Sequence, residues 1–151
     1  MSNELSIERV LDAPVAALWR AYTHHLNEWF CPPPWRAEVV EMDLRPGGRS
    51  AITMYGPDGE VMPNDGIYLE VVPERRIVFT DALTTDWQPQ GPFMVGGFEF
   101  EPDGERTRYR GWARHWTKEA KAQHEAMGFE AGWGKVAEQL EAVAKRIAAE
   151  G

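Results

Sequence analysis

The feature that most constrains the fold is a series of six short strand patterns joined by turns in the middle of the chain. The residue patterns of these stretches are strand-like, and they lie at 35–44, 50–55, 65–72, 76–83, 93–101 and 106–116. The turns carry sequences such as Pro-Gly-Gly and Gly-Pro-Asp-Gly, and one longer polar loop precedes the fifth stretch. Connections this short cannot hold crossover helices, so the six strands are expected to form an antiparallel meander.

A strand and short helices are expected before the meander. Residues 4–11 alternate in the manner of a half-buried strand. Asp12 and Pro14 then begin a helix over 14–24, because a carboxylate can cap free backbone N–H groups and proline is tolerated in the first turn. A second short helical segment must end at the three prolines that follow Cys31, since proline lacks an N–H donor.

A long amphipathic helix is expected after Thr117. Ala, Glu and Lys dominate this segment, and its larger apolar residues recur at helical spacing on one stripe. The stripe consists of Trp133, Val136, Leu140, Val143 and Ile147. Gly128, Gly132 and Gly134 each weaken a helix by about 1 kcal/mol relative to alanine. They indicate either a kink near 128 or close contact with another backbone there.

These elements predict an α+β fold, with residues 1–151 forming one domain. A curved antiparallel sheet of about seven strands would surround the C-terminal helix, and a space would remain between them. In the last strand, the side facing the helix would carry Thr107, Tyr109, Gly111, Ala113 and His115. The opposite, solvent-facing side would carry Arg108, Arg110 and Arg114 together with Trp112 and Trp116.

Several short motifs follow one another in a specific order. They are IERVLDAPVAALWRAYT at 7–23, Trp29-Phe30, DLRPGG at 43–48, PDGE at 57–60, GIYLEVVPERRIVFT at 66–80 and GWGKVAEQL at 132–140. As an ordered set they resemble the START-like (SRPBCC, helix-grip) superfamily over essentially the whole chain. The branch to which the chain is most similar contains small bacterial proteins related to the C-terminal domain of the heat-shock-protein-90 ATPase activator. The resemblance implies a hydrophobic cavity between sheet and helix and supplies no fixed catalytic set.

Aromatic residues are the main candidates for lining such a cavity. Seven Trp, six Phe and four Tyr in a short chain provide much flat apolar surface that must be buried or must line a pocket. Ordinary core packing is the alternative for each of them. Tyr109 and His115 could also orient a ligand or act in acid/base chemistry. The ligand-cavity candidates are Trp19, Trp29, Phe30, Trp35, Phe79, Trp87, Phe93, Tyr109, His115 and Trp133.

Other chemistry has weaker support in the sequence. His24, His25 and Glu28 could share a helix face, but HExxH and cysteine-rich patterns are absent, so neither a metal site nor a cofactor is expected. Cys31 precedes three prolines and is expected to be inert. A buried carboxylate in a strand would be a functional candidate through a raised pKa, although the solvent face is the expected place for all four. These four are Glu41, Asp43, Glu70 and Asp81.

Charge and cysteine content limit the partners. The 16 Lys+Arg and 24 Asp+Glu residues give a formal net charge of −8, which disfavours nucleic acid and anionic membrane surfaces. A single cysteine and an acidic N-terminal segment indicate a cytoplasmic protein. Exposed strand edges make a homodimer a reasonable expectation.

Three functions remain open at this point. The first is binding of a small apolar or amphipathic molecule, including an aromatic one, without catalysis. The second is a co-chaperone-like protein-interaction module of the ATPase-activator type, in which the pocket is incidental and a chaperone is the partner. The third is a cyclase or hydrolase, which needs two titratable side chains to converge inside the cavity.

Overall fold

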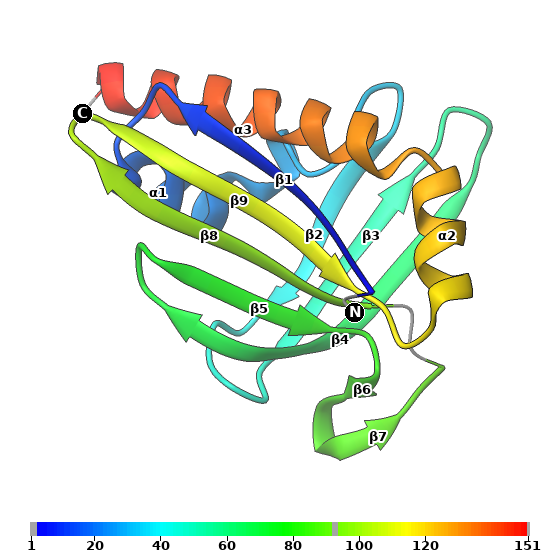
Figure 1. Cartoon of the computed structure of the whole chain (residues 1–151). Coiled ribbons are helices and arrows are strands. Elements are labelled where there is room, and N and C mark those ends of the chain that lie inside the picture. The colour runs from blue at the N-terminus through cyan, green and yellow to red at the C-terminus, as the bar shows by residue number, and fades with distance from the viewer. Residues whose placement is uncertain (1–2, 92–93, 151) are drawn as a thin grey trace.

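The computed structural model describes residues 3–91 and 94–150 and contains one large antiparallel sheet (Figure 1). Within these residues the sheet has seven strands in the order β1-β9-β8-β5-β4-β3-β2. The strands are β1 (Glu4–Leu11), β2 (Arg36–Met42), β3 (Arg49–Tyr55), β4 (Val61–Val72), β5 (Arg76–Thr80), β8 (Val95–Asp103) and β9 (Arg106–Arg114). The order is a meander from β2 to β9 with β1 added beside β9, so the predicted antiparallel meander is confirmed.

Helices cover one face of this sheet. They are α1 (Val15–His25), the 3-10 helix η1 (Leu26–Glu28), α2 (Lys118–Ala126) and α3 (Phe129–Glu150). In Figure 1 the long helix α3 runs beside β1, and α1 lies on the same side of the sheet. The buried residues of α3 include Leu140 and Val143 from the predicted stripe. The helix-grip arrangement with short helices after the first strand is therefore confirmed. None of the described helices has a stretch that is long and apolar enough to cross a membrane.

Gly128 separates α2 from α3. Its φ is +93°, a conformation that residues with a Cβ rarely adopt, and a Cβ at this position would meet nothing within 4 Å. A Cβ on Gly132 would also meet open space, whereas one on Gly134 would lie 3.2 Å from the Arg9 guanidinium. Of the two alternatives raised by these glycines, the structure shows the kink, because the helical segment is interrupted at Gly128 between α2 and α3.

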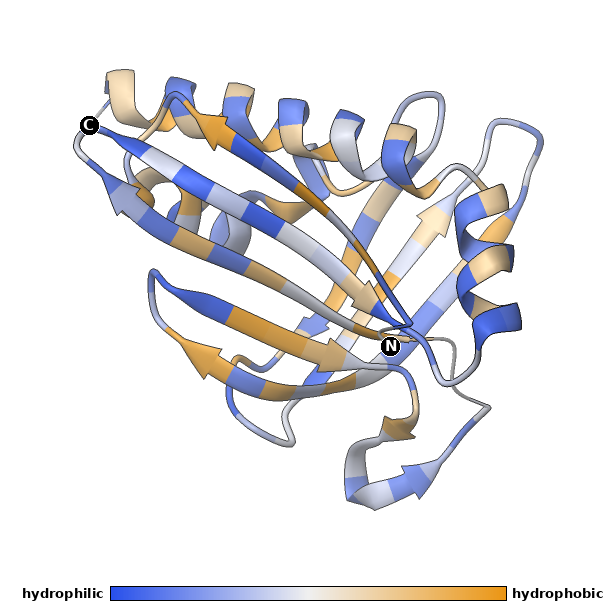
Figure 2. Ribbon diagram, viewed as in Figure 1, coloured by the Kyte–Doolittle hydropathy of each residue, from blue (hydrophilic) through white to orange (hydrophobic). Residues whose placement is uncertain are grey.

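The side chains of the sheet alternate between the helix-covered face and the outer face. Figure 2 shows this as orange and blue segments that alternate along β8. The register places Ile7 of β1 and Phe98 of β8 on either side of Gly111 in β9. Tyr109 and His115 are both buried, at 2% and 6% exposed, as the alternation in β9 predicted.

A small two-stranded arm projects from the sheet where a polar loop was expected. It consists of β6 (Leu83–Thr84), the 3-10 helix η2 (Thr85–Trp87) and β7 (Gln88–Pro89). Strands of two residues are too short to produce a periodic signal in the sequence. Asp86 and Trp87 have positive φ values of 65° and 59°, and the Trp87 ring packs against Gly47.

Candidate functional site

Phe98 lies at the centre of the space between the sheet and the helices. It is 4% exposed, and the rings of Phe79, Tyr109 and Trp133 lie within 25° of parallel to its ring. The ring centroids nearest to that of Phe98 among the described residues are Tyr22 at 5.5 Å, Phe79 and Trp133 at 5.8 Å, and Trp29 and Tyr109 at 6.2 Å. These six residues are called the aromatic cluster below. Their mutual contacts contribute to the core beyond the area that they bury.

Two members of the aromatic cluster are only half-buried. Phe79 and Trp133 reach solvent, whereas Phe98 and Tyr109 beside them are covered. Both half-buried rings lie over glycines: a Cβ on Gly96 would be 2.5 Å from the Phe79 ring, and one on Gly111 would be 3.2 Å from the Trp133 ring. These rings occupy room that strand side chains would otherwise fill. We call the region between Phe79 and Trp133 the open end of the grip.

Tyr68 brings a polar group to this apolar interior. Tyr68 on β4 is paired directly with Phe79 on β5 and is 1% exposed. Its hydroxyl is buried and makes no hydrogen bond of good geometry with any described residue, although the Tyr22 and Ser50 hydroxyls lie close enough to influence its pKa. A buried hydroxyl without a proper partner is uncommon and unfavourable.

Three tyrosine hydroxyls of the interior remain protonated at neutral pH. Burial raises the pKa of Tyr68, and the Asp43 carboxylate adds to this rise. Burial also raises the pKa of Tyr22 and of Tyr109 well above the ordinary value. The three tyrosine hydroxyls of the interior are therefore neutral hydrogen-bonding groups.

His115 forms a buried pair with His124 of α2. The Nδ1 of His115 lies 2.9 Å from the Asn3 carbonyl oxygen, which can only accept, so Nδ1 carries the proton. Nε2 of His115 then accepts from Nδ1 of His124 at 2.8 Å. Burial, aided by His115, lowers the pKa of His124 to about 4. His124 in turn packs edge-on against Phe129 and Trp133, so the pair supports one wall of the open end.

The sequence candidates separate into three groups. Trp29, Phe79, Tyr109 and Trp133 belong to the aromatic cluster, and His115 approaches it through His124. Trp19 and Phe30 are half-buried and pack against the core. The structure places the remaining described candidates elsewhere: Trp35 beside Gly56, and Trp87, 68% exposed, on the β6–β7 arm. Phe93 lies outside the described residues.

Three important residues were not among the candidates. Phe98 follows two glycines in a stretch of alternating Phe and Glu, which is a signal that could have identified it as inward-facing. Tyr22 lies on the apolar stripe of its helix, so its burial could also have been expected. The lack of a well-formed hydrogen bond at the Tyr68 hydroxyl could not have been predicted from the sequence, because it depends on how residues from other elements are placed around it.

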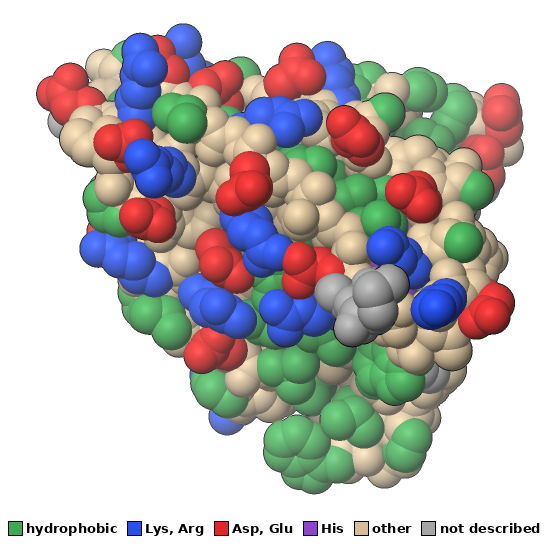
Figure 3. Space-filling view, in the orientation of Figure 1, with side chains coloured by type: hydrophobic (Ala, Val, Ile, Leu, Met, Phe, Trp, Pro, Cys, Tyr) green, Lys and Arg blue, Asp and Glu red, His purple; other side chains and the backbone are tan. Residues whose placement is uncertain are grey.

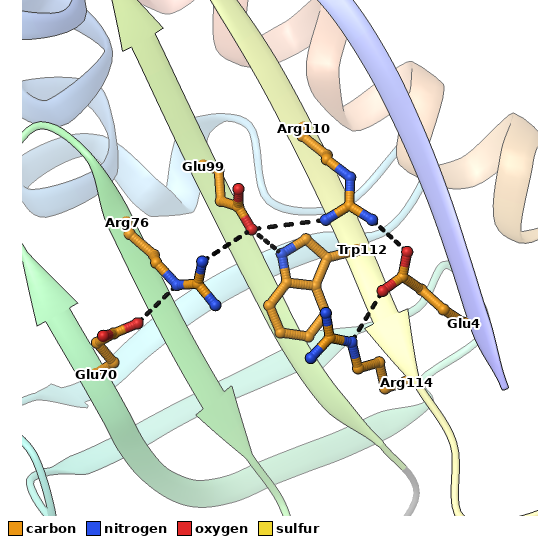
Figure 4. Close-up of polar contacts among 7 residues, drawn as sticks. All are labelled: Glu4, Glu70, Arg76, Glu99, Arg110, Trp112 and Arg114. Atoms are coloured by element: carbon orange, nitrogen blue, oxygen red, sulfur yellow. Dashed lines mark hydrogen bonds and ion pairs between the residues drawn. The ribbon is translucent and has the colours of Figure 1, made fainter. Parts of the chain in front are cut away.

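Charged side chains on the outer face of the sheet form a chain of ion pairs (Figure 4). Arg76 lies 2.6 Å from Glu70 and 3.4 Å from Glu99, and Arg110 lies 3.5 Å from Glu99 and also pairs with Glu4. In Figure 3 basic and acidic side chains interleave over this face. The charges neutralise one another, and partly exposed pairs of this kind contribute little to stability.

Trp112 is enclosed by this network, and the expectation that it faces solvent is wrong. It is 1% exposed, its indole N–H donates to Glu99 at 2.6 Å, and the guanidinium groups of Arg76 and Arg114 lie 5.8 and 4.4 Å from its ring centroid. Gly97 on the neighbouring strand has no side chain and leaves room for the ring, since a Cβ there would lie 2.3 Å from it. A Trp on an outer face is thus buried by its neighbours.

Two surface hollows lie away from the open end. One of about 660 Å³ is on the outer face and is lined mainly by charged residues such as Arg75, Glu101 and Arg108. The other, of about 450 Å³, is lined by polar residues including Asp65 and Thr84. The aromatic cluster itself occupies the space between the sheet and α3, so a molecule that entered there would have to move some of the rings.

The described part of the chain contains no cluster of side chains that could bind a metal ion. Within residues 3–91 and 94–150, groups of three or more His, Cys, Asp or Glu side chains that could hold a metal ion do not occur. His25 instead pairs with Glu28 at 2.5 Å, and Arg146 reaches the same carboxylate at 2.7 Å. Cys31 is half-buried, and burial raises the pKa of its thiol, which disfavours the reactive thiolate.

Comparison with known proteins gives one family and several solved structures. A family model described as Activator of Hsp90 ATPase homolog 1-like protein matches residues 12–145. A crystal structure of a Nitrosomonas europaea protein is 39% identical, with 97% of this chain and 96% of that chain covered and a TM-score of 0.92. A Mycobacterium smegmatis protein is 28% identical over 94% of this chain and 90% of that chain, with a TM-score of 0.78. An AHSA1-like protein from Aeromonas hydrophila shares the fold at 19% identity, 96% and 94% coverage and a TM-score of 0.72. No curated protein matches the chain.

Proposed function

The chain belongs to the family of Activator of Hsp90 ATPase homolog 1-like proteins, and from this premise we propose that it binds a small, flat, largely apolar molecule at the open end of the grip. The observation that carries the proposal is the position of two half-buried rings: Phe79 lies over Gly96 and beside the buried Tyr68, and Trp133 lies over Gly111. A ligand would enter between these two rings and stack on Phe98.

The half-buried rings are the parts of the wall that can move at the lowest cost. A fully covered ring such as Phe98 is held by neighbours on every side, and moving it would open a cavity. Phe79 and Trp133 have solvent on one side, and the glycines beneath them offer no side chain that would resist their movement. Rotation of either ring would uncover the Phe98 face without a change in the backbone.

Burial of the ligand would supply enough free energy for measurable affinity. A two-ring molecule that buries about 200 Å² of apolar surface gains on the order of 5 kcal/mol at 25 cal/mol/Å², before the cost of ordering the ligand. Stacking on the nearly parallel rings of the cluster would add about 1 kcal/mol. Dissociation constants between tens of micromolar and the millimolar range are therefore expected for simple probes.

Protein-observed NMR with a panel of small aromatic fragments tests the proposal. Binding is expected to shift the side-chain signals of Phe79, Phe98 and Trp133, while those of Trp87 and Trp116, which are 68% and 53% exposed, remain in place. Shifts confined to the two exposed tryptophans, or no shifts with the whole panel, would contradict it.

A matched pair of variants adds a second test. Trp133→Ala removes one wall of the open end. For any fragment that binds the wild-type chain, the affinity of this variant is expected to be at least about tenfold lower. Trp116→Ala removes an exposed ring elsewhere and is expected to leave the affinity unchanged. Equal affinities for the two variants would place the binding site outside the open end.

The family description favours a second candidate, stimulation of an Hsp90-type ATPase. A partner protein would meet the outer sheet face, where basic and acidic side chains interleave (Figure 3). ATP turnover by Hsp90 measured with and without the chain tests this role. Stimulation that Arg75→Glu with Arg108→Glu abolishes would support it, and an unchanged turnover would exclude it.

A further inference from the structure

We propose that the ligand of the open end is a neutral molecule that presents a hydrogen-bond acceptor to the Tyr68 hydroxyl, and that carboxylates are rejected. This inference rests on the proposed function and deepens it by naming the class of ligand. It is carried by the buried hydroxyl of Tyr68, which makes no hydrogen bond of good geometry with any described residue.

Tyr68 lies beside the Phe79 ring, which a ligand at the open end would displace. Tyr68 and Phe79 are directly opposed on neighbouring strands, so their side chains lie next to each other on the same face. A molecule that displaced the Phe79 ring would take its place beside Tyr68. An acceptor on that molecule would satisfy a donor that is buried and poorly satisfied in the free protein.

The electrostatic surroundings of Tyr68 select against an anion. The nearby hydroxyls of Tyr22 and Ser50 are neutral groups, and the charged side chain that acts on Tyr68 is Asp43, which is negative. Asp43 pairs with Arg45 at 2.8 Å, but Arg45 is the more exposed of the two, at 71% against 35%. A carboxylate brought to Tyr68 would lose its water and meet a negative charge, and both effects disfavour its charged form.

Three probes of similar size separate the contributions of the hydrogen bond, the charge and the apolar ring. They are 2-naphthamide, which is neutral with a carbonyl acceptor, 2-naphthoate, which is its anionic analogue, and 2-ethylnaphthalene, which has no polar group. Calorimetric titration of the full chain at neutral pH is expected to give at least tenfold tighter binding for the amide than for the carboxylate, in line with the cost of burying an unpaired charge. Equal affinities for these two probes would overturn the inference.

Tyr68→Phe tests whether the hydroxyl carries this selectivity, because the variant keeps the ring. Its affinity for 2-naphthamide is expected to fall about fivefold or more, the equivalent of one neutral hydrogen bond, while its affinity for 2-ethylnaphthalene stays within about twofold. Tyr55→Phe, which alters a tyrosine stacked under Arg36, is the matched control and is expected to change neither affinity.

The outcomes distinguish this inference from the proposed function. If none of the probes binds to the wild-type chain, both fail. If the probes bind but Tyr68→Phe lowers the affinities for 2-naphthamide and 2-ethylnaphthalene equally, or leaves both unchanged, the binding site is supported and the role of the Tyr68 hydroxyl is refuted. Loss of the amide alone supports both.

Discussion

Replacing Tyr68 with phenylalanine is expected to stabilise the free protein, although the loss of a buried, hydrogen-bonded hydroxyl usually destabilises a protein. The Tyr68 side chain is 1% exposed, and its hydroxyl lacks a well-formed hydrogen bond to the described residues. Burying a hydroxyl without a partner costs about 1–3 kcal/mol. The Tyr22 and Ser50 hydroxyls are close enough to return part of this cost, so we expect a gain at the lower limit, about 1 kcal/mol.

Thr107→Val is the matched control because its hydroxyl is buried and satisfied. Thr107 is 0% exposed, and its hydroxyl donates to the Ala13 carbonyl at 2.8 Å. Its replacement removes this hydrogen bond and leaves the carbonyl unpaired, which should cost about 1–2 kcal/mol. The two variants therefore each remove one buried hydroxyl but should change stability in opposite directions.

Urea denaturation provides the assay. The midpoint should rise for Tyr68→Phe and fall for Thr107→Val with no change in the slope, since neither alters the surface exposed on unfolding. Each 1 kcal/mol corresponds to a change of about 2–4 °C in Tm for a chain of this length. If Tyr68→Phe loses as much stability as Thr107→Val, the Tyr68 hydroxyl of the wild-type protein already has a hydrogen-bond partner, and the reasoning is refuted.

Three further outcomes follow from the fold. Gly128→Ala should destabilise the chain by about 1–2 kcal/mol, because alanine rarely adopts the positive φ of this position. Gly132→Ala should stabilise the chain by up to about 1 kcal/mol, because Gly132 lies within α3 and an added Cβ would meet open space. Thermal unfolding of the two variants checks both signs. Because the pKa of His124 is lowered to about 4 in the folded state, the unfolded chain binds a proton there first, so the free energy of unfolding should fall as the pH drops from about 6.5 to about 4. An NMR titration in which the His124 ring protonates near pH 6.5 would contradict this. Phe98→Ala should cost about 3–5 kcal/mol by opening a cavity at the centre of the aromatic cluster, which urea denaturation measures; a loss below about 1 kcal/mol would contradict the packing described.

Periodic features of the sequence were sufficient to predict most of the fold. The six strand-like stretches with their turns predicted the sheet, and the apolar stripe that contains Leu140 predicted α3. Alternation in the last strand placed Tyr109 and His115 inward, and both are buried. Periodicity succeeds where a side chain's environment is set by its own element.

Features that depend on several elements at once could not be read from the sequence. Trp112 is buried only because Gly97 and two arginines from two strands enclose it. The hydroxyl of Tyr68 lacks a well-formed hydrogen bond because the nearby hydroxyls of Tyr22 on α1 and Ser50 on β3 do not meet it in good geometry. The β6–β7 arm carries Trp87 away from the core with backbone angles that no alternation encodes. The candidate site depends on such features. The sequence therefore indicated that the site is aromatic, but it did not identify the Tyr68 hydroxyl as its polar group.

A crystal structure of the chain with 2-naphthamide is the most direct test of the proposed binding site. The naphthalene ring is expected between Phe79 and Trp133, with the amide oxygen within hydrogen-bonding distance of the Tyr68 hydroxyl. Density for the probe on the outer face of the sheet, in the hollow lined by Arg75 and Arg108, with the aromatic cluster unchanged, would contradict the account.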